Sequence, residues 1–202
     1  FNMIAFYRDE NNHLTIDGMC LDGLMSDFGS PLYVYSGAGL QRSLAAFQSA
    51  VAPVSGKIHF ALKANSALGV VALLARCGAG ADIVSVGELT RALTAGIAAS
   101  DIVFSGVGKR AVDIRAALAS GIGQINAESA AEVSQISTIA ANMGVVAPVA
   151  LRVNVDVDSG THAKISTGQL STKFGISTNK REAATIYTKL IADPSMGEAA
   201  AL

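Results

Sequence analysis

Lys63 is the residue of this sequence whose type and position best suit covalent chemistry. It follows an apolar run at residues 58–62 and precedes a helical pattern. In a barrel of alternating strands and helices, the carboxyl ends of the strands form the active-site face. Partial desolvation there disfavours a charged ammonium, and a neutral amine is the form that attacks an aldehyde. A structural or surface lysine at the end of a strand would show the same pattern.

The histidines and cysteines do not have the spacing of a metal site. His13, His59 and His162 are widely separated, and Cys20 and Cys77 form no CxxC pair. We therefore expect no metal. Both cysteines are expected to be small buried apolar residues in a reducing, cytoplasmic setting.

The strand that positions Lys63 is the first of a regular series. Strand-like runs begin near residues 58, 80, 102 and 124, at a constant step of 22 residues. Strands separated by helices run parallel, and equal steps favour a barrel. The runs are nearly continuously apolar, which is typical of parallel strands that are packed on both faces. The five predicted strands are residues 58–61, 81–85, 102–105, 124–127 and 149–155.

The predicted fold class is α/β, a TIM (β/α)8 barrel that is truncated after about five βα units, because a complete barrel has eight. Residues 31–202 are assigned to this partial barrel. The less regular residues 1–30 are assigned to a second, β-rich domain. Residues 31–36 are predicted to form a short strand. Since an open parallel sheet leaves an unpaired edge, we expect residues 1–202 alone to fold poorly.

Capping residues support the positions of the predicted helices. Ser36 is placed to cap a helix of about fifteen residues, and Ser66 is placed to cap a helix that ends near Gly78. Two Ser-x-x-Glu patterns, which fit the capping box, and three glycines at expected helix ends complete the set. These residues are Ser85 with Glu88, Ser129 with Glu132, and Gly96, Gly121 and Gly144.

Composition excludes several classes of partner. The formal net charge is −1 and half of the residues are hydrophobic, with no basic cluster for nucleic acid or for anionic lipid. The apolar runs are too short to span a membrane, and no secretory signal opens the sequence. The partner is therefore expected to be a small molecule.

The segment around Lys63 resembles a known family. Residues 60–66 (FALKANS) are similar to the cofactor-lysine motif of the fold-type III, or alanine racemase-like, pyridoxal-phosphate enzymes, and residues 78–89 (GAGADIVSVGEL) are similar to their next βα unit. Within this family, further stretches in the same order resemble the diaminopimelate decarboxylases. These stretches are residues 29–35, 104–109, 125–129, 151–154, 162–168 and 171–175.

The resemblance implies roles for particular residues. Lys63 would hold pyridoxal 5'-phosphate as a Schiff base, and Asp82, Glu88 and Arg152 would lie near this cofactor. His162 would lie in a loop near the substrate, and Lys173 would correspond to a basic residue near the cofactor's hydroxyl group. Structural alternatives stay open for each: a helix cap for Glu88, a strand-end contact for Asp82, half of a buried ion pair for Arg152, and loop packing for the last two.

The resemblance also implies an activity, the decarboxylation of meso-diaminopimelate to L-lysine by a cytoplasmic homodimer, with residues 1–202 inactive alone. One alternative keeps the cofactor and changes the substrate to arginine, ornithine or carboxynorspermidine, or changes the reaction to racemisation. The other is a non-enzymatic pyridoxal-phosphate-binding barrel. Residues 1–29 argue against it, because such a barrel needs no additional sheet.

Overall fold

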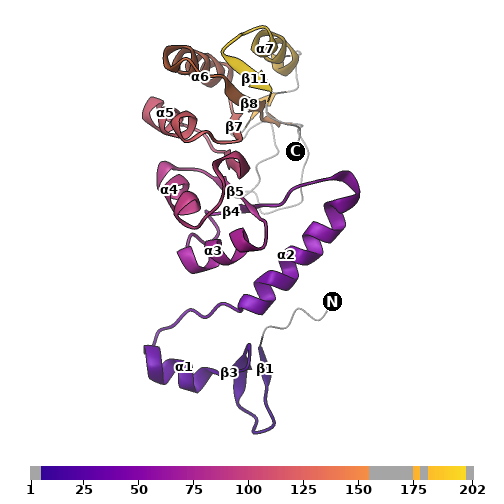
Figure 1. The fold of residues 1–202 in the computed structure, drawn as a ribbon, viewed down its shortest axis with the longest axis vertical. Helices are drawn as coiled ribbons and strands as arrows, with labels where there is room; N and C mark the ends of the chain where they lie inside the picture. The colour runs from indigo at the N-terminus through magenta and orange to yellow at the C-terminus, as the bar shows by residue number, and fades with distance from the viewer. Residues whose placement is uncertain (1–5, 155–174, 178–181, 199–202) are drawn as a thin grey trace.

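The computed structural model describes residues 6–154, 175–177 and 182–198, and its centre is a parallel sheet of six strands (Figure 1). The strands follow one another across the sheet in the order of the sequence, with the last strand at one edge and β4 at the other. They are β4 (His59–Ala61), β5 (Gly80–Ile83), β6 (Ile102–Phe104), β7 (Gln124–Ala127), β8 (Ala147–Leu151) and β11 (Met196–Glu198).

The strand order distinguishes a barrel wall from a doubly wound sheet, in which the order reverses part-way. Each strand here pairs in parallel with its neighbour in sequence, so the sheet is an arc of a βα barrel, as predicted. Helices α3 to α6 lie along one side of it (Figure 1). The helices of the repeat are α3 (Leu68–Arg76), α4 (Val86–Thr94), α5 (Ala111–Ser120), α6 (Ala130–Met143) and α7 (Glu182–Ile191).

The main hydrophobic core lies between the strands and these helices. Ile83, Phe104 and Ile125, each at most 1% exposed, belong to it. The residues that alternate with them, such as Asp82 and Asn126, are only half-buried. The prediction of continuously apolar strands is therefore wrong for β5 and β7, because the helices cover only one face and polar side chains occupy the other.

Two strand assignments differ from the prediction. The expected fifth strand is divided into β8 and a short strand, β9 (Val153–Asn154), which pairs with β10 (Ile176–Ser177) in a separate sheet. In addition, β11 forms a sixth parallel strand beside β8. Its sequence, Met-Gly-Glu, has no β-branched residue, so the strand is recognised only by its pairing.

Most of the predicted helix caps are confirmed. Ser36, Ser85 and Ser129 each accept a backbone N–H at the start of a helix, and Gly96, Gly121 and Gly144 all have positive φ. The prediction for Ser66 is wrong. The helix begins after Ala67, whose backbone N–H donates to Asn65 Oδ1 instead.

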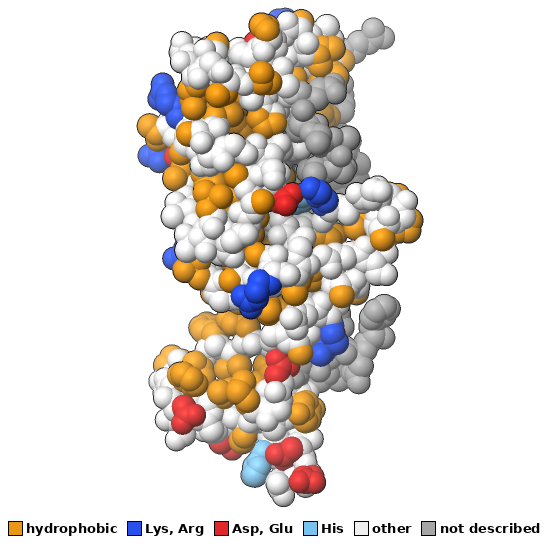
Figure 2. All heavy atoms as spheres, in the orientation of Figure 1, with side chains coloured by type: hydrophobic (Ala, Val, Ile, Leu, Met, Phe, Trp, Pro, Cys, Tyr) orange, Lys and Arg blue, Asp and Glu red, His pale blue; other side chains and the backbone are white. Residues whose placement is uncertain are grey.

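The N-terminal residues form a separate antiparallel sheet of β1 (Phe6–Arg8), β2 (Leu14–Ile16) and β3 (Met19–Cys20), followed by α1 (Leu21–Phe28). Residues 31–36 contain no strand, contrary to the prediction. They lead to α2 (Gly37–Val51) and a 3₁₀ turn, η1 (Ala52–Val54). A second 3₁₀ turn, η2 (Ala99–Asp101), precedes β6. No residue of α1 is buried, and apolar side chains gather over this part of the molecule (Figure 2). The assignment of residues 1–30 to a second domain stays a prediction.

Asp17 joins this N-terminal part to the start of α2. Its carboxylate accepts hydrogen bonds from the Ser36 hydroxyl at 2.7 Å and from the Ala38 backbone N–H at 3.1 Å. The hydrogen bond from Ser36 is the main reason that the pKa of Asp17 is lowered.

Within the described residues, no helix has both the length and the apolar character needed to cross a membrane.

Candidate functional site

Lys63 stands at the carboxyl end of β4, as predicted. The preceding Leu62 is completely buried, whereas Lys63 itself is exposed in the turn that leads to α3. The expectation of a poorly hydrated amine is therefore wrong for the described residues. The physical reason is the place of β4 at the edge of the sheet, where no further described strand pairs with it on its outer side.

Asp82 lies next to this turn on the neighbouring strand. It is level with Ala61 in the pairing of β4 with β5, and its backbone carbonyl accepts the N–H of Leu62 at 3.0 Å. Its carboxylate oxygen Oδ1 accepts a hydrogen bond from the hydroxyl of Ser105, which follows β6. A carboxylate is thus held on the strand next to β4, which leads into the turn that carries Lys63.

Two residues of β7 continue this contact across the sheet. Asn126 Nδ2 donates to Ser105 Oγ at 3.0 Å, and Gln124 Nε2 donates to Asn126 Oδ1 at 2.7 Å. The sequence analysis assigned no role to Ser105, Asn126 or Gln124. The alternation of polar residues at 124 and 126 with apolar residues at 125 and 127 is the signal that could have identified them.

Glu88 has the structural role that was the alternative to cofactor contact. Its backbone N–H donates to Ser85 Oγ at 3.2 Å, and its own Oε2 accepts the backbone N–H of Val84 at 2.6 Å. The carboxylate therefore accepts the backbone N–H of the residue before the N-cap rather than the N–H of the N-cap residue itself. Contact between Glu88 and a cofactor stays a prediction.

Arg152 also has its alternative role, because it forms an ion pair with a buried partner. Arg152 Nη1 lies 3.0 Å from Glu128 Oε1, and the Glu128 side chain is only 5% exposed. The other oxygen of Glu128 accepts the backbone N–H of Gly175 at 3.0 Å. Glu128 thus joins the end of β8 to the residue that precedes β10.

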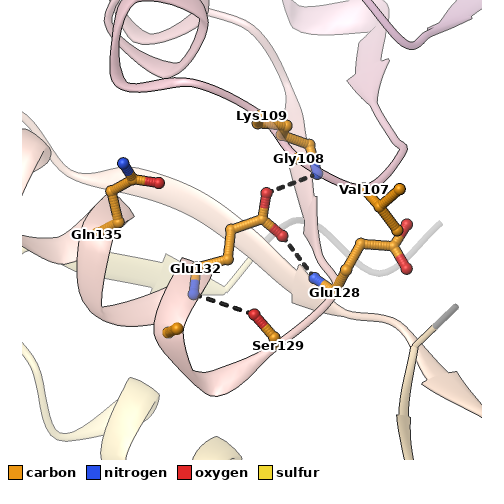
Figure 3. A pocket seen from close by; sticks show the side chains of 8 residues that line it. Val107, Gly108, Lys109, Glu128, Ser129, Glu132 and Gln135 are labelled. Carbon is orange, nitrogen blue, oxygen red and sulfur yellow. Dashed lines mark hydrogen bonds and ion pairs between the residues drawn. The ribbon is translucent and has the colours of Figure 1, made fainter. Parts of the chain in front are cut away.

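A second buried ion pair was missed by sequence reasoning. Lys109 Nζ lies 3.1 Å from Glu132 Oε1, with side chains 2% and 9% exposed (Figure 3). It also donates to the carbonyls of Gly106 and Asn126, both at 2.7 Å. The Phe104 ring lies below it, 5.7 Å from centroid to Nζ. These contacts fix the β6–α5 loop against the end of β7.

A cavity of about 550 Å³ opens beside this ion pair (Figure 3). Its polar lining comes from the loops that follow β6 and β7 and from the first turns of α6, which places it at the carboxyl end of the sheet, where ligands bind in barrels of this kind. The residues that line it are Val107, Gly108, Lys109, Glu128, Ser129, Ala131, Glu132 and Gln135.

The structure therefore brings Lys63, Asp82 and Arg152 to the carboxyl ends of β4, β5 and β8 on one sheet. His162 and Lys173 lie outside the described residues. Among the residues that are described, no group of three or more His, Cys, Asp or Glu side chains could hold a metal ion. Cys20 and Cys77 are free thiols, half-buried rather than fully buried as expected, because they lie at the ends of a strand and a helix.

The side chains at this edge fit the aldehyde end of pyridoxal phosphate. An exposed primary amine is accessible to an aldehyde, and the carboxylate on the adjacent strand supplies a negative charge for a cationic nitrogen. A family model described as the pyridoxal-binding domain of pyridoxal-dependent decarboxylases matches residues 38–195. The chain belongs to this family. The family resemblance of the sequence motifs is thereby confirmed.

Individual relatives agree with this assignment. Diaminopimelate decarboxylase from Pseudomonas aeruginosa is 48% identical over 177 residues, which cover 88% of this chain and 42% of that protein. The crystal structure of diaminopimelate decarboxylase from Helicobacter pylori complexed with L-lysine matches with a TM-score of 0.85 at 37% identity, over 88% of this chain and 45% of that one. The crystal structure of diaminopimelate decarboxylase from M. jannaschii in co-complex with L-lysine matches with a TM-score of 0.88 at 30% identity, over 96% of this chain and 46% of that one. The chain spans less than half the length of these relatives.

Proposed function

We propose that this chain is the cofactor-binding part of a pyridoxal-phosphate-dependent decarboxylase that converts meso-diaminopimelate to L-lysine. The observation that carries the proposal is the exposed Lys63 at the carboxyl end of β4, with Asp82 on the adjacent strand β5, where it is level with Ala61. Sequence identity of 48% to a diaminopimelate decarboxylase over 88% of the chain supports this substrate.

In this proposal, the Lys63 amine would hold pyridoxal phosphate through its aldehyde carbon, and the exposure of this residue leaves the site accessible to the amine of a substrate. Bound pyridoxal phosphate supplies the conjugated ring that delocalises the electron pair left when carbon dioxide departs. The Asp82 carboxylate would supply negative charge close to the nitrogen that holds the cofactor. Leu62, which is completely buried, anchors the turn that presents the amine.

The remaining candidates have supporting parts in the same proposal. Arg152 carries positive charge at the end of β8 and is oriented by Glu128, and Glu88 orders the first turn of α4. His162 and Lys173 keep the roles that the family resemblance implies, near the substrate and near the cofactor.

We further propose that the complete protein is a cytoplasmic homodimer with a small amino acid as its substrate. The lysine complexes of the structural relatives support an amino-acid ligand, and the two free thiols are compatible with a reducing compartment. The expectation that residues 1–202 alone are inactive and fold poorly belongs to the same proposal.

The proposal is tested with the complete protein and its Lys63→Ala variant. We expect the unmodified protein to show the absorbance of covalently bound pyridoxal phosphate and to release carbon dioxide from meso-diaminopimelate, and we expect the variant to lose both. Three other results would each support an alternative instead. They are release of carbon dioxide from arginine, ornithine or carboxynorspermidine, racemisation of an amino acid, and cofactor binding without turnover. Undiminished absorbance in the variant would show that another lysine binds the cofactor.

A further inference from the structure

A chain of hydrogen bonds crosses the open face of the sheet and ends on the Asp82 carboxylate. Gln124 donates to Asn126, Asn126 donates to Ser105, and Ser105 donates to Asp82. The four residues come from β7, from the end of β6 and from β5, so each step but the first passes to a neighbouring strand. The last two bonds run toward β5, the neighbour of the strand that precedes Lys63.

The chemistry of the groups permits one direction for this chain. An ionised carboxylate only accepts hydrogen bonds, and a serine hydroxyl has a single hydrogen to donate. Once Ser105 donates to Asp82, it must accept from the amide NH₂ of Asn126, and the amide oxygen of Asn126 is left to accept from Gln124. Aligned hydrogen bonds of this kind polarise and strengthen one another.

Lys109 fixes the middle of the chain from the other side. Its buried ammonium donates to the backbone carbonyl of Asn126 at 2.7 Å and is itself paired with Glu132. The backbone of Asn126 is thus fixed by the ion pair while its side chain orders Ser105. This arrangement makes the position of the Asp82 carboxylate depend on residues two strands away.

We infer that Ser105 and Asn126 are positioning residues, which hold the Asp82 carboxylate as a fixed negative charge beside the covalent link between Lys63 and the cofactor aldehyde. The inference rests on the proposed function, because it takes Lys63 as the residue that forms the link. Asp82 is level with Ala61, and its backbone carbonyl binds the N–H of Leu62, so a change in its carboxylate acts directly next to the turn that carries Lys63.

The test titrates the complete apoprotein with pyridoxal phosphate and follows the absorbance and the visible circular dichroism of the bound cofactor. Removing a hydrogen bond to a charged group is expected to weaken cofactor binding about tenfold in Ser105→Ala. Asn126→Ala, which acts through the serine, is expected to weaken it about threefold. Ser105→Thr keeps the hydroxyl and is expected to restore the affinity and the dichroism signal.

The double variant tests the order of the chain. If Asn126 acts through Ser105, the double variant binds the cofactor no more weakly than Ser105→Ala alone. Ser134→Ala is the matched control, because Ser134 is an exposed serine on α6 whose hydroxyl donates to the carbonyl of Ala130, one turn earlier in the same helix. Thermal unfolding of each apoprotein separates a loss of stability from a loss of cofactor affinity.

Equal affinity of Ser105→Ala and Ser134→Ala, or additive losses in the double variant, would overturn the inference. If Asn126→Ala does not fold, the comparison of Ser105→Ala with Ser105→Thr decides alone. The proposed function fails separately: it fails if Lys63→Ala keeps the covalent link. If Lys63→Ala loses the covalent link and Ser105→Ala binds the cofactor normally, only the inference about Ser105 and Asn126 is contradicted.

Discussion

Two βα units of this protein begin their helices with the same Ser-x-x-Glu pattern and differ in what surrounds it. In the β5–α4 unit, Glu88 donates its backbone N–H to Ser85 Oγ at 3.2 Å, and in the β7–α6 unit Glu132 does the same to Ser129, also at 3.2 Å. In both units the glutamate carboxylate accepts the N–H of the residue before the serine. The local geometry is therefore shared.

The difference lies in a partner from another unit. The carboxylate of Glu132 is buried and paired with Lys109, whereas Glu88 is half-exposed and forms no ion pair with any residue in the described part of the chain. A capping motif thus acts as a surface feature in one unit and as part of a buried charge cluster in the other. Residues distant in sequence decide which of the two roles it has.

The largest expected effect is on the buried pair. Lys109→Met removes the cation and leaves the Glu132 carboxylate buried without it, so the free energy of unfolding is expected to fall by about 3–5 kcal/mol. Lys57→Met is the matched control, because the exposed pair of Lys57 with Asp101 is expected to contribute at most about 1 kcal/mol. Denaturant unfolding of the complete protein measures both, and equal losses would show that the burial of the Lys109 pair has no energetic consequence.

A smaller effect tests the shared part of the two units. Ser85→Ala and Ser129→Ala each remove an N-cap acceptor and are each expected to lower the free energy of unfolding by about 1 kcal/mol. The two losses should agree within about 0.5 kcal/mol, because the serine bonds have the same length. A much larger loss for Ser129→Ala would mean that the cap and the buried ion pair are energetically coupled, and that the cap does not act independently of its surroundings.

The smallest effect concerns a third unit, β6–α5, in which an acid pairs with its own N-cap residue. Asp113 accepts hydrogen bonds from the Arg110 side chain at 2.9 Å and from its backbone N–H at 3.0 Å, and these bonds lower the pKa of the Asp113 carboxyl. A lowered folded-state pKa stabilises the protein above about pH 4, and that stabilisation is lost as the pH falls through the lowered pKa.

Thermal unfolding between pH 5 and 3 therefore distinguishes Asp113→Asn from the unmodified protein. The unmodified protein is expected to lose more of its stability on acidification than the variant, since the variant has no carboxyl to protonate at this position. Identical pH dependence of the two proteins would show that the Arg110 contacts do not persist in solution.

Most local features of this fold were predictable from the sequence, with the cap at Ser66 and the strand at residues 31–36 as exceptions, and contacts between units were not. The βα series, the caps at Ser36, Ser85 and Ser129 and the position of Lys63 depend on residues within a few positions of one another. The buried pair of Lys109 with Glu132 and the chain from Gln124 to Asp82 depend on which strands are neighbours and which face each side chain occupies. The short strand β11 has no pattern of its own and exists through its pairing with β8.

The error about Lys63 has the same origin. Its place at the end of a strand is a local property, and it was predicted correctly, whereas its hydration depends on what covers the edge of β4. Likewise, the structural roles of Glu88 and Arg152 could not be seen without the positions of Val84 and Glu128, and their contact with the cofactor stays a prediction.

The most direct test of the account is to identify the lysine that binds the cofactor. The complete protein is loaded with pyridoxal phosphate, reduced with borohydride to make the link permanent, digested, and analysed by mass spectrometry. We expect the added mass on the peptide that contains Lys63. Added mass on a peptide containing another lysine, or on no peptide, would contradict the assignment.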